Sequence, residues 1–160
     1  MNDNTRVVAL GSDHAGYELK QVISAWLLEN GWDVRDVGAP SAERANYPQY
    51  GRAAAELVLS GECARGVLIC GTGVGMGLAA NKMRGIRCAV CSEPFTARLA
   101  RQHNDANMLA LGARVVGSGL AVMIVEEFLD AEFEGGRHKG RVDMITQIEE
   151  ENRIGDSREL

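Results

Sequence analysis

Residues 67–83 read VLICGTGVGMGLAANKM, and this stretch decides the fold. Its first four residues form an unbroken apolar run, which is typical of a strand buried on both faces of a parallel sheet. The glycine-rich turn that follows leads into a helix through Ala79, Ala80 and Met83. A buried strand, a tight turn and a helix in this order predict one βα unit of an α/β fold.

The same alternation continues on both sides of this unit. Short apolar runs predict further strands at residues 7–10, 32–37, 86–91 and 108–111. Amphipathic stretches predict helices at residues 15–30, 48–59, 92–103, 120–129 and 142–151. Ser92 is the expected cap of the third of these helices. The pattern predicts one doubly wound, Rossmann-like domain, a three-layer αβα sandwich with a five-stranded parallel sheet, and we expect strand order 2-1-3-4-5.

The composition fits one such domain. The chain has 160 residues, 46% of them hydrophobic, which allows one buried core and excludes a disordered chain. We expect the domain to span residues 1–152 and an acidic, flexible tail to follow at 153–160. Lys and Arg total 17 against 22 Asp and Glu, and the net charge of −5 argues against binding to nucleic acid or to an anionic membrane surface.

The sequence also predicts a cytoplasmic location. No apolar run approaches the roughly 20 residues of a membrane span, and the start MNDNTRVV lacks the pattern of a secretory signal. The four cysteines lie in or near apolar segments and are expected to be reduced thiols. Cys88 and Cys91 form a C-x-x-C pair, but within a strand their side chains would face opposite ways, so a structural role is expected.

The glycine turn at residues 71–77 is a candidate anion site, because backbone N–H groups before a helix bind anions. It lacks the Gly-Lys-Ser/Thr of a P-loop, and Met76 or Leu78 stands where the dinucleotide fingerprint has its third glycine. Glu93 lies about where a ribose-binding acid would, so a nucleotide-dependent oxidoreductase stays an alternative. A second alternative is that the glycines only allow tight packing between the strand and the helix.

Several reactive side chains are expected around this turn. Cys70 ends a strand just before a helix, where the helix dipole favours a thiolate, although a buried thiol without chemistry is the alternative. Asp13-His14 and His103-Asn104 are each candidates for function or for simple capping, and we expect them to converge on one sheet edge. The basic run at residues 137–141 could grip a phosphate dianion. Together these residues suggest a small phosphorylated substrate.

Six blocks of the sequence carry a resemblance to a known family. They are GSDHAGYELK (11–20), NYPQYG (46–51), CGTGVGMGLAANK (70–82), CSEPFTARLARQHNDAN (91–107), LGARVVG (111–117) and FEGGRHKGRVD (133–143). In this order and spacing, over about residues 7–150, they resemble the type B ribose-5-phosphate isomerases, a family that also includes allose-6-phosphate and galactose-6-phosphate isomerases.

The resemblance implies an aldose–ketose isomerase of the pentose phosphate pathway that needs no cofactor and no metal. It would interconvert ribose 5-phosphate and ribulose 5-phosphate by ring opening and a cis-enediolate. The family assembles as homodimers or dimers of dimers, with active sites across the subunit interface. Alternatives are an isomerase of a six-carbon sugar such as allose 6-phosphate and a phosphosugar-sensing domain without catalysis.

The resemblance also assigns catalytic roles to individual residues. Cys70 matches the base that moves the proton between C2 and C1, and Thr72 would hydrogen-bond beside its thiol. His103 matches the residue that opens the furanose ring, with Asp13 as its polar partner. The amides that would form the anion hole around the enediolate belong to Gly71, Gly73, Val74 and Gly75.

The resemblance assigns substrate contacts as well. Asn104 would bind the substrate hydroxyls or the enediolate, and Tyr47 would line the sugar pocket. The residues that match the phosphate grip are His14, Arg114, Arg137 and Arg141. Two positions differ among relatives: some carry a catalytic glutamate where this chain has Met76, and most have aspartate at Asn46. Cys70 is therefore the one obvious base, and Asn46 could alter substrate preference.

Overall fold

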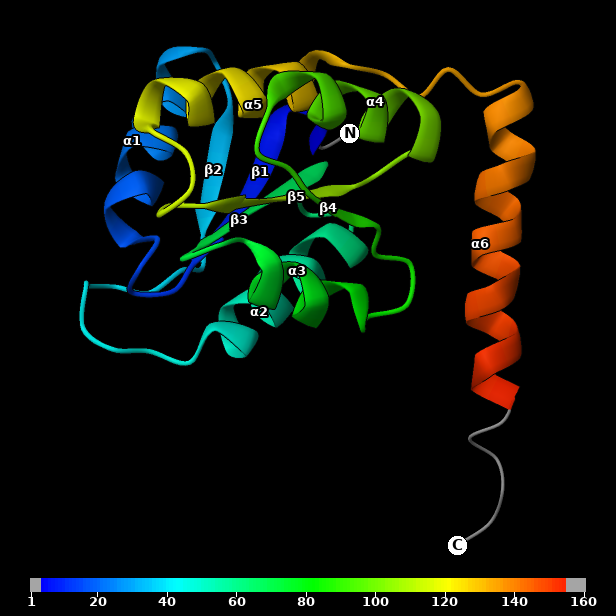
Figure 1. Cartoon of the computed structure of the whole chain (residues 1–160), viewed down its shortest axis with the longest axis horizontal. Helices are drawn as coiled ribbons and strands as arrows, with labels where there is room; N and C mark the ends of the chain where they lie inside the picture. Colours follow the sequence, from blue (N-terminus) through cyan, green and yellow to red (C-terminus); the bar gives the residue numbers. More distant parts are fainter. Residues whose placement is uncertain (1–3, 155–160) are drawn as a thin grey trace, which may run out of the picture.

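The computed structural model describes residues 4–154 and confirms the α/β class (Figure 1). The strands are β1 Val7–Ser12, β2 Asp33–Asp36, β3 Arg65–Cys70, β4 Cys88–Val90 and β5 Met108–Gly112. The helices are α1 Tyr17–Glu29, α2 Tyr47–Leu59, α3 Val74–Asn81, α4 Pro94–Asn104, α5 Ser118–Asp130 and α6 Arg137–Ile154, with a 3₁₀ turn at Asn4–Arg6. All strand pairs are parallel.

The sheet is covered on both faces: α1, α4 and α5 lie above it in Figure 1, and α2 and α3 lie below. Alternate side chains of each central strand enter two separate cores, as the period of two of a strand requires. In β3, for example, Ile69 belongs to the core under α1, α4 and α5, whereas Cys70 belongs to the core under α2 and α3.

Cys88 and Cys91 follow the same alternation and point into opposite cores, which confirms the expected arrangement of the C-x-x-C pair. Burial raises the pKa of Cys88 to about 12 and that of Cys91 to about 11, so neither thiol ionises near neutral pH. The two remaining cysteines are free and buried as well.

The expected strand order was wrong, because the sheet runs β2-β1-β3-β5-β4. β5 consists of five buried residues and pairs with β3 in the middle of the sheet, whereas the three residues of β4 are partly exposed. The longer apolar strand gains more from burial on both faces, which places the short β4 at the edge. The point where the strand order reverses still lies between β1 and β3, as expected.

Two local predictions also need correction. Glu93, not Ser92, caps α4: its carboxylate accepts a hydrogen bond from the Thr96 N–H at 2.8 Å, which lowers the pKa of Glu93. That carboxylate is thus already engaged, which weakens the nucleotide-binding alternative. The helix after the glycine turn ends at Asn81, before Met83.

The last helix was expected to begin at residue 142, but α6 begins at Arg137, so the basic run at residues 137–141 forms its first part. Gly135 and Gly136 have φ of 65° and 51°, so they supply the left-handed backbone that precedes the helix. α6 continues to Ile154, two residues past the expected domain end, and the rest of the expected tail lies outside the described residues. In residues 4–154, no helix combines the length and apolar character needed to cross a membrane.

Gly16 is a position where a side chain would disturb the fold. A Cβ atom there would lie 2.3 Å from the carbonyl oxygen of Ile69, because the start of α1 packs directly on the backbone of β3. Gly16→Ala is therefore expected to lower the free energy of unfolding by about 1–3 kcal/mol, measured by urea denaturation. Gly119→Ala is the matched control, since nothing lies within 4 Å of that Cβ, and it should be neutral or stabilising. Equal urea midpoints for the two variants would contradict the packing argument.

Candidate active site

The carboxyl ends of β1 and β3 bring the first two candidate residues together. Asp13 directly follows β1, and its N–H donates to the carbonyl of Ile69, one residue before Cys70. The Asp13 carboxylate accepts a hydrogen bond from the Gly16 N–H at 3.0 Å, so it also caps the turn into α1. An acid and a thiol thus lie at adjacent strand ends, on either side of the switch point.

The glycine turn wraps around the thiol. The Gly73 N–H donates to Cys70 Sγ at 3.1 Å, and the thiol is only 5% exposed. Gly73 has φ of 80°, and a Cβ there would lie 2.9 Å from the backbone of Leu111. Only glycine fits this left-handed, tightly packed position. The turn therefore directs the Gly73 N–H at the sulfur and places the thiol just before the start of α3.

Thr72 differs from the expectation that it hydrogen-bonds beside the thiol. Its hydroxyl accepts from the Val74 N–H at 3.3 Å, and this is the hydrogen bond that it makes within residues 4–154. The side chain is exposed at the mouth of the turn. Thr72 thus supports the turn conformation and remains accessible to a ligand.

A pocket of about 630 Å³ opens beside this turn, lined by Asp13, His14 and residues 44–49, which run from the loop before α2 into its first turn. His14 Nδ1 accepts a hydrogen bond from the Ala45 N–H at 3.3 Å, which ties this loop to the end of β1. Tyr47 is partly exposed, and its ring lies so close to Gly75 that a Cβ there would clash. Asn46 begins α2 without a side-chain cap and faces the same pocket.

Lys20 anchors the loop that leads to this pocket, and the sequence analysis missed it. The side chain is only 3% exposed, and Nζ contacts the Asp36 carboxylate at 2.8 Å and the carbonyl of Ala39 at 3.0 Å. The Ala39 N–H in turn donates to the carbonyl of Ser12. A buried lysine needs such partners, so this network fixes the backbone next to Asp13.

Arg114 supplies a cation on the same edge. It follows β5, its N–H donates to the carbonyl of Gly71 at 3.0 Å, and a Cβ on Gly71 would lie 3.3 Å from its guanidinium. The guanidinium is exposed beside the glycine turn. An arginine next to a run of backbone N–H groups is well suited to an anionic group such as a phosphate.

His103 and Asn104 do not join this edge, so the expected convergence was wrong. A helix of a βα unit runs opposite to its strand, so α4 returns the chain toward the start of β5. His103 lies in the last turn of α4, at this amino-terminal edge of the sheet. The length of β3 from Gly66 to Cys70 alone separates the two edges by about 13 Å. In one chain these candidates lie at opposite ends of the sheet.

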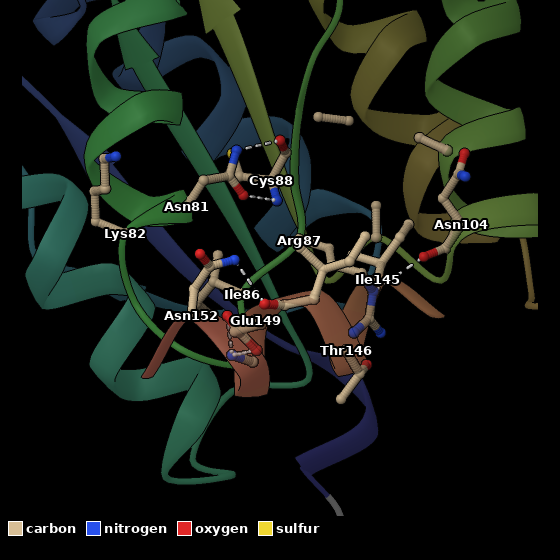
Figure 2. Close-up of a pocket in the computed structure, with 15 residues that line it drawn as sticks. Asn81, Lys82, Ile86, Arg87, Cys88, Asn104, Ile145, Thr146, Glu149 and Asn152 are labelled. Carbon is tan, nitrogen blue, oxygen red and sulfur yellow. Dashed lines mark hydrogen bonds between the residues drawn. The ribbon is translucent and has the colours of Figure 1, made fainter. Parts of the chain in front are cut away.

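Arg137 and Arg141 lie with His103 at the far edge, because α5 also runs back and the Glu134 N–H donates to the carbonyl of Gln102. Asn104 lines a second pocket, of about 660 Å³, between α6 and the body of the domain (Figure 2). Ile145 of α6 lines the same pocket. The candidates therefore form two groups, one at each end of the sheet.

The second group contains two residues that the sequence analysis did not single out. His138 is 5% exposed, and its ring stacks on that of His103 with centroids 4.1 Å apart and planes 5° from parallel. Glu134 Oε2 lies 3.5 Å from Nε2 of His138 and 3.8 Å from Nε2 of His103. The signal was present in the block FEGGRHKGRVD, but only its arginines were used.

The fold and the first group define a doubly wound α/β protein with a buried thiol inside a glycine-rich turn at its switch point. The sequence model described as Ribose/Galactose Isomerase matches residues 8–145, and the chain belongs to this family.

Close relatives agree with this assignment. Ribose-5-phosphate isomerase B of Escherichia coli K12 is 55% identical, over 89% of this chain and 96% of its own. The solved structure of ribose-5-phosphate isomerase B from Clostridium thermocellum is 52% identical with a TM-score of 0.90, covering 91% of this chain and 99% of that one. D-erythrulose-4-phosphate isomerase of Pectobacterium atrosepticum is 41% identical, over 91% and 97% of the two chains.

Proposed function

We propose that the protein is an aldose–ketose isomerase that interconverts ribose 5-phosphate and ribulose 5-phosphate. The observation that carries the proposal is the Cys70 thiol, held by the Gly73 N–H at the switch point beside a pocket with acidic, imidazole and guanidinium groups. The names of the E. coli and C. thermocellum relatives support the same reaction. Free thiols and a metabolic substrate also favour a cytoplasmic location.

In the proposed chemistry, Cys70 is the base. Its thiolate removes the proton from C2 of the open aldose, the electron pair moves to form the enediolate, and the same proton returns to C1 to give the ketose. The N–H groups of Gly71, Gly73, Val74 and Gly75 stabilise the negative oxygen of the intermediate. A proton also passes from the C2 hydroxyl to O1, and with both transfers the aldose becomes the ketose with no net gain or loss of protons or electrons.

The other proposed roles need the second group of residues. His103 would open the furanose ring with Asp13 as a polar partner, and Asn104 would bind the substrate hydroxyls. The phosphate would be held from both sides by His14, Arg114, Arg137 and Arg141. Since these residues lie at opposite ends of the sheet in one chain, the proposed site is completed by a second copy.

We therefore propose a homodimer, alone or paired into a dimer of dimers, with each site built across the interface. Large apolar side chains exposed around β4 support this proposal, and they include Val74, Leu78, Val90 and Phe95. α6 adds Met144, Ile145 and Ile148, the last two of which line the pocket between α6 and the body of the domain. Exposed apolar surface next to a short edge strand is typical of an interface with another chain.

The test is isomerisation of ribose 5-phosphate by purified protein in the presence of a chelator. Metal-independent conversion to ribulose 5-phosphate is the expected result. Allose 6-phosphate and erythrose 4-phosphate run in parallel, because the Pectobacterium relative is named for a four-carbon sugar and Asn46 faces the pocket. Tight binding of a sugar phosphate without turnover of any of the three would contradict the proposal and favour a sensing domain.

A further inference from the structure

The stacked pair formed by His103 and His138 is a feature that the proposed reaction does not explain. The two imidazoles are parallel, and one carboxylate lies beside both rings. Each ring can rotate about two torsion angles, so this arrangement requires neighbouring groups that hold both rings in place. Glu134 is fixed by its backbone N–H, which donates to the carbonyl of Gln102 in α4. The segment before α6 is thus attached to the end of α4 at the point where His103 lies.

A shared metal ion does not fit this cluster. A metal bound by two imidazoles lies about 2.1 Å from each nitrogen, along lone pairs in the planes of the rings. The two ring planes here are 5° from parallel with centroids 4.1 Å apart, so their lone pairs cannot meet at one point. The stacking geometry instead suits a role in which the His138 ring fixes the orientation of the His103 ring.

The two histidines have different surroundings. His138 is buried, and its Nε2 accepts a hydrogen bond from Nε of Arg137 at 3.4 Å, which requires a neutral ring. Burial, followed by the nearby charges of His103 and Arg137, lowers the pKa of His138, and Arg141 acts in the same direction against Glu134. His103 is more exposed, with its Nε2 facing the Glu134 carboxylate. A neutral ring beneath it avoids repulsion between two imidazolium groups.

We propose that Glu134 and His138 are positioning residues that hold the imidazole of His103 in the orientation needed to open the sugar ring. The inference rests on the proposed function, in which His103 acts on the furanose. Ring opening breaks the bond between C1 and O4, removes the proton of the C1 hydroxyl and delivers a proton to O4. An imidazole oriented by a carboxylate is the usual solution for such proton transfers.

Ring opening can be measured separately from isomerisation. In a Cys70→Ala background the enediolate cannot form, but ring opening still exchanges the α and β anomers of ribose 5-phosphate, which magnetisation-transfer NMR follows directly. Adding Glu134→Gln or His138→Gln to this background is expected to slow the protein-catalysed exchange about 10-fold. Glu132→Gln is the matched control, because this exposed acid lies two residues earlier and pairs with neither imidazole. It should leave the exchange unchanged.

A second readout tests the stacking itself. The chain has three histidines, so their imidazole proton signals can be assigned from single substitutions. His138→Gln should shift the His103 signals, because the ring current of the stacked neighbour is lost. Unmoved His103 signals would overturn the inference, and so would Zn²⁺ at stoichiometric amounts shifting both His103 and His138.

The outcomes separate this inference from the proposed function. If the wild-type chain isomerises ribose 5-phosphate and the Glu134→Gln variant exchanges anomers at the parent rate, only the positioning role fails. If the wild type isomerises but the Cys70→Ala protein does not speed anomer exchange above buffer, the role of His103 fails and the inference fails with it. Absence of isomerisation in the wild type would overturn the proposed function as well.

Discussion

Replacing Cys70 by alanine is expected to reduce the kcat for ribose 5-phosphate by about 10³-fold or more, because the variant has no group in place to take the proton from C2. No other side chain can substitute for it, since Met76, at the position where some relatives have a glutamate, is fully buried and has no basic group. The thiol is held by the Gly73 N–H alone among the described hydrogen bonds, so the fold should tolerate its removal. Steady-state kinetics together with a thermal melt measure both effects.

Cys63→Ala is the matched control for this prediction. Cys63 is buried in the same core as Cys70, but it lies before β3, at the opposite edge of the sheet. Its removal deletes a comparable buried side chain and should leave kcat unchanged. A Cys70→Ala protein with near-normal turnover would remove the cysteine from the proposed mechanism, and an equal loss in both variants would indicate a general effect of core packing.

Two inactive variants, Cys70→Ala and His103→Ala, are expected to restore activity when their chains assemble together. Each variant damages a different group of site residues, and these groups lie at opposite ends of the sheet in one chain. In a mixed dimer one site would carry both substitutions and the other neither. Random pairing should therefore give about a quarter of wild-type activity in the co-expressed mixture, and the mixed dimer isolated through two different tags should have about half.

The control pairs two variants from the same group, Cys70→Ala and Asp13→Asn. Both residues lie at the carboxyl ends of neighbouring strands, so every site of the mixed dimer contains one of the two substitutions. No recovery is expected from this pair. Equal recovery from both mixtures, or none from either, would contradict a site shared between two chains.

The sequence was a good guide to local structure. The apolar run before the glycine turn predicted β3, and the glycines predicted a tight turn into a helix, because both depend on residues close together in the chain. Glu93 was misjudged because Ser92 and Glu93 both suit a helix cap, and only the backbone conformation decides between them.

The long-range arrangement was harder to predict. The order of β4 and β5 depends on how much each strand gains from burial on two faces, which alternation of elements does not reveal. The position of His103 could have been derived, since a helix that follows a strand ends at the opposite sheet edge. The stacking of His103 on His138 could not, because it depends on the path of residues 131–136 after α5.

The separation of the two groups of site residues has a consequence for how activity scales with the amount of protein. A single chain holds a thiol without its ring-opening partner, so in the proposed assembly an isolated chain is inert towards sugar phosphates. Under conditions where most chains are unpaired, the number of working sites grows with the square of chain concentration, by mass action. Specific activity is constant for an enzyme whose active site lies within one chain. In the proposed assembly it instead rises with the fraction of chains that are paired.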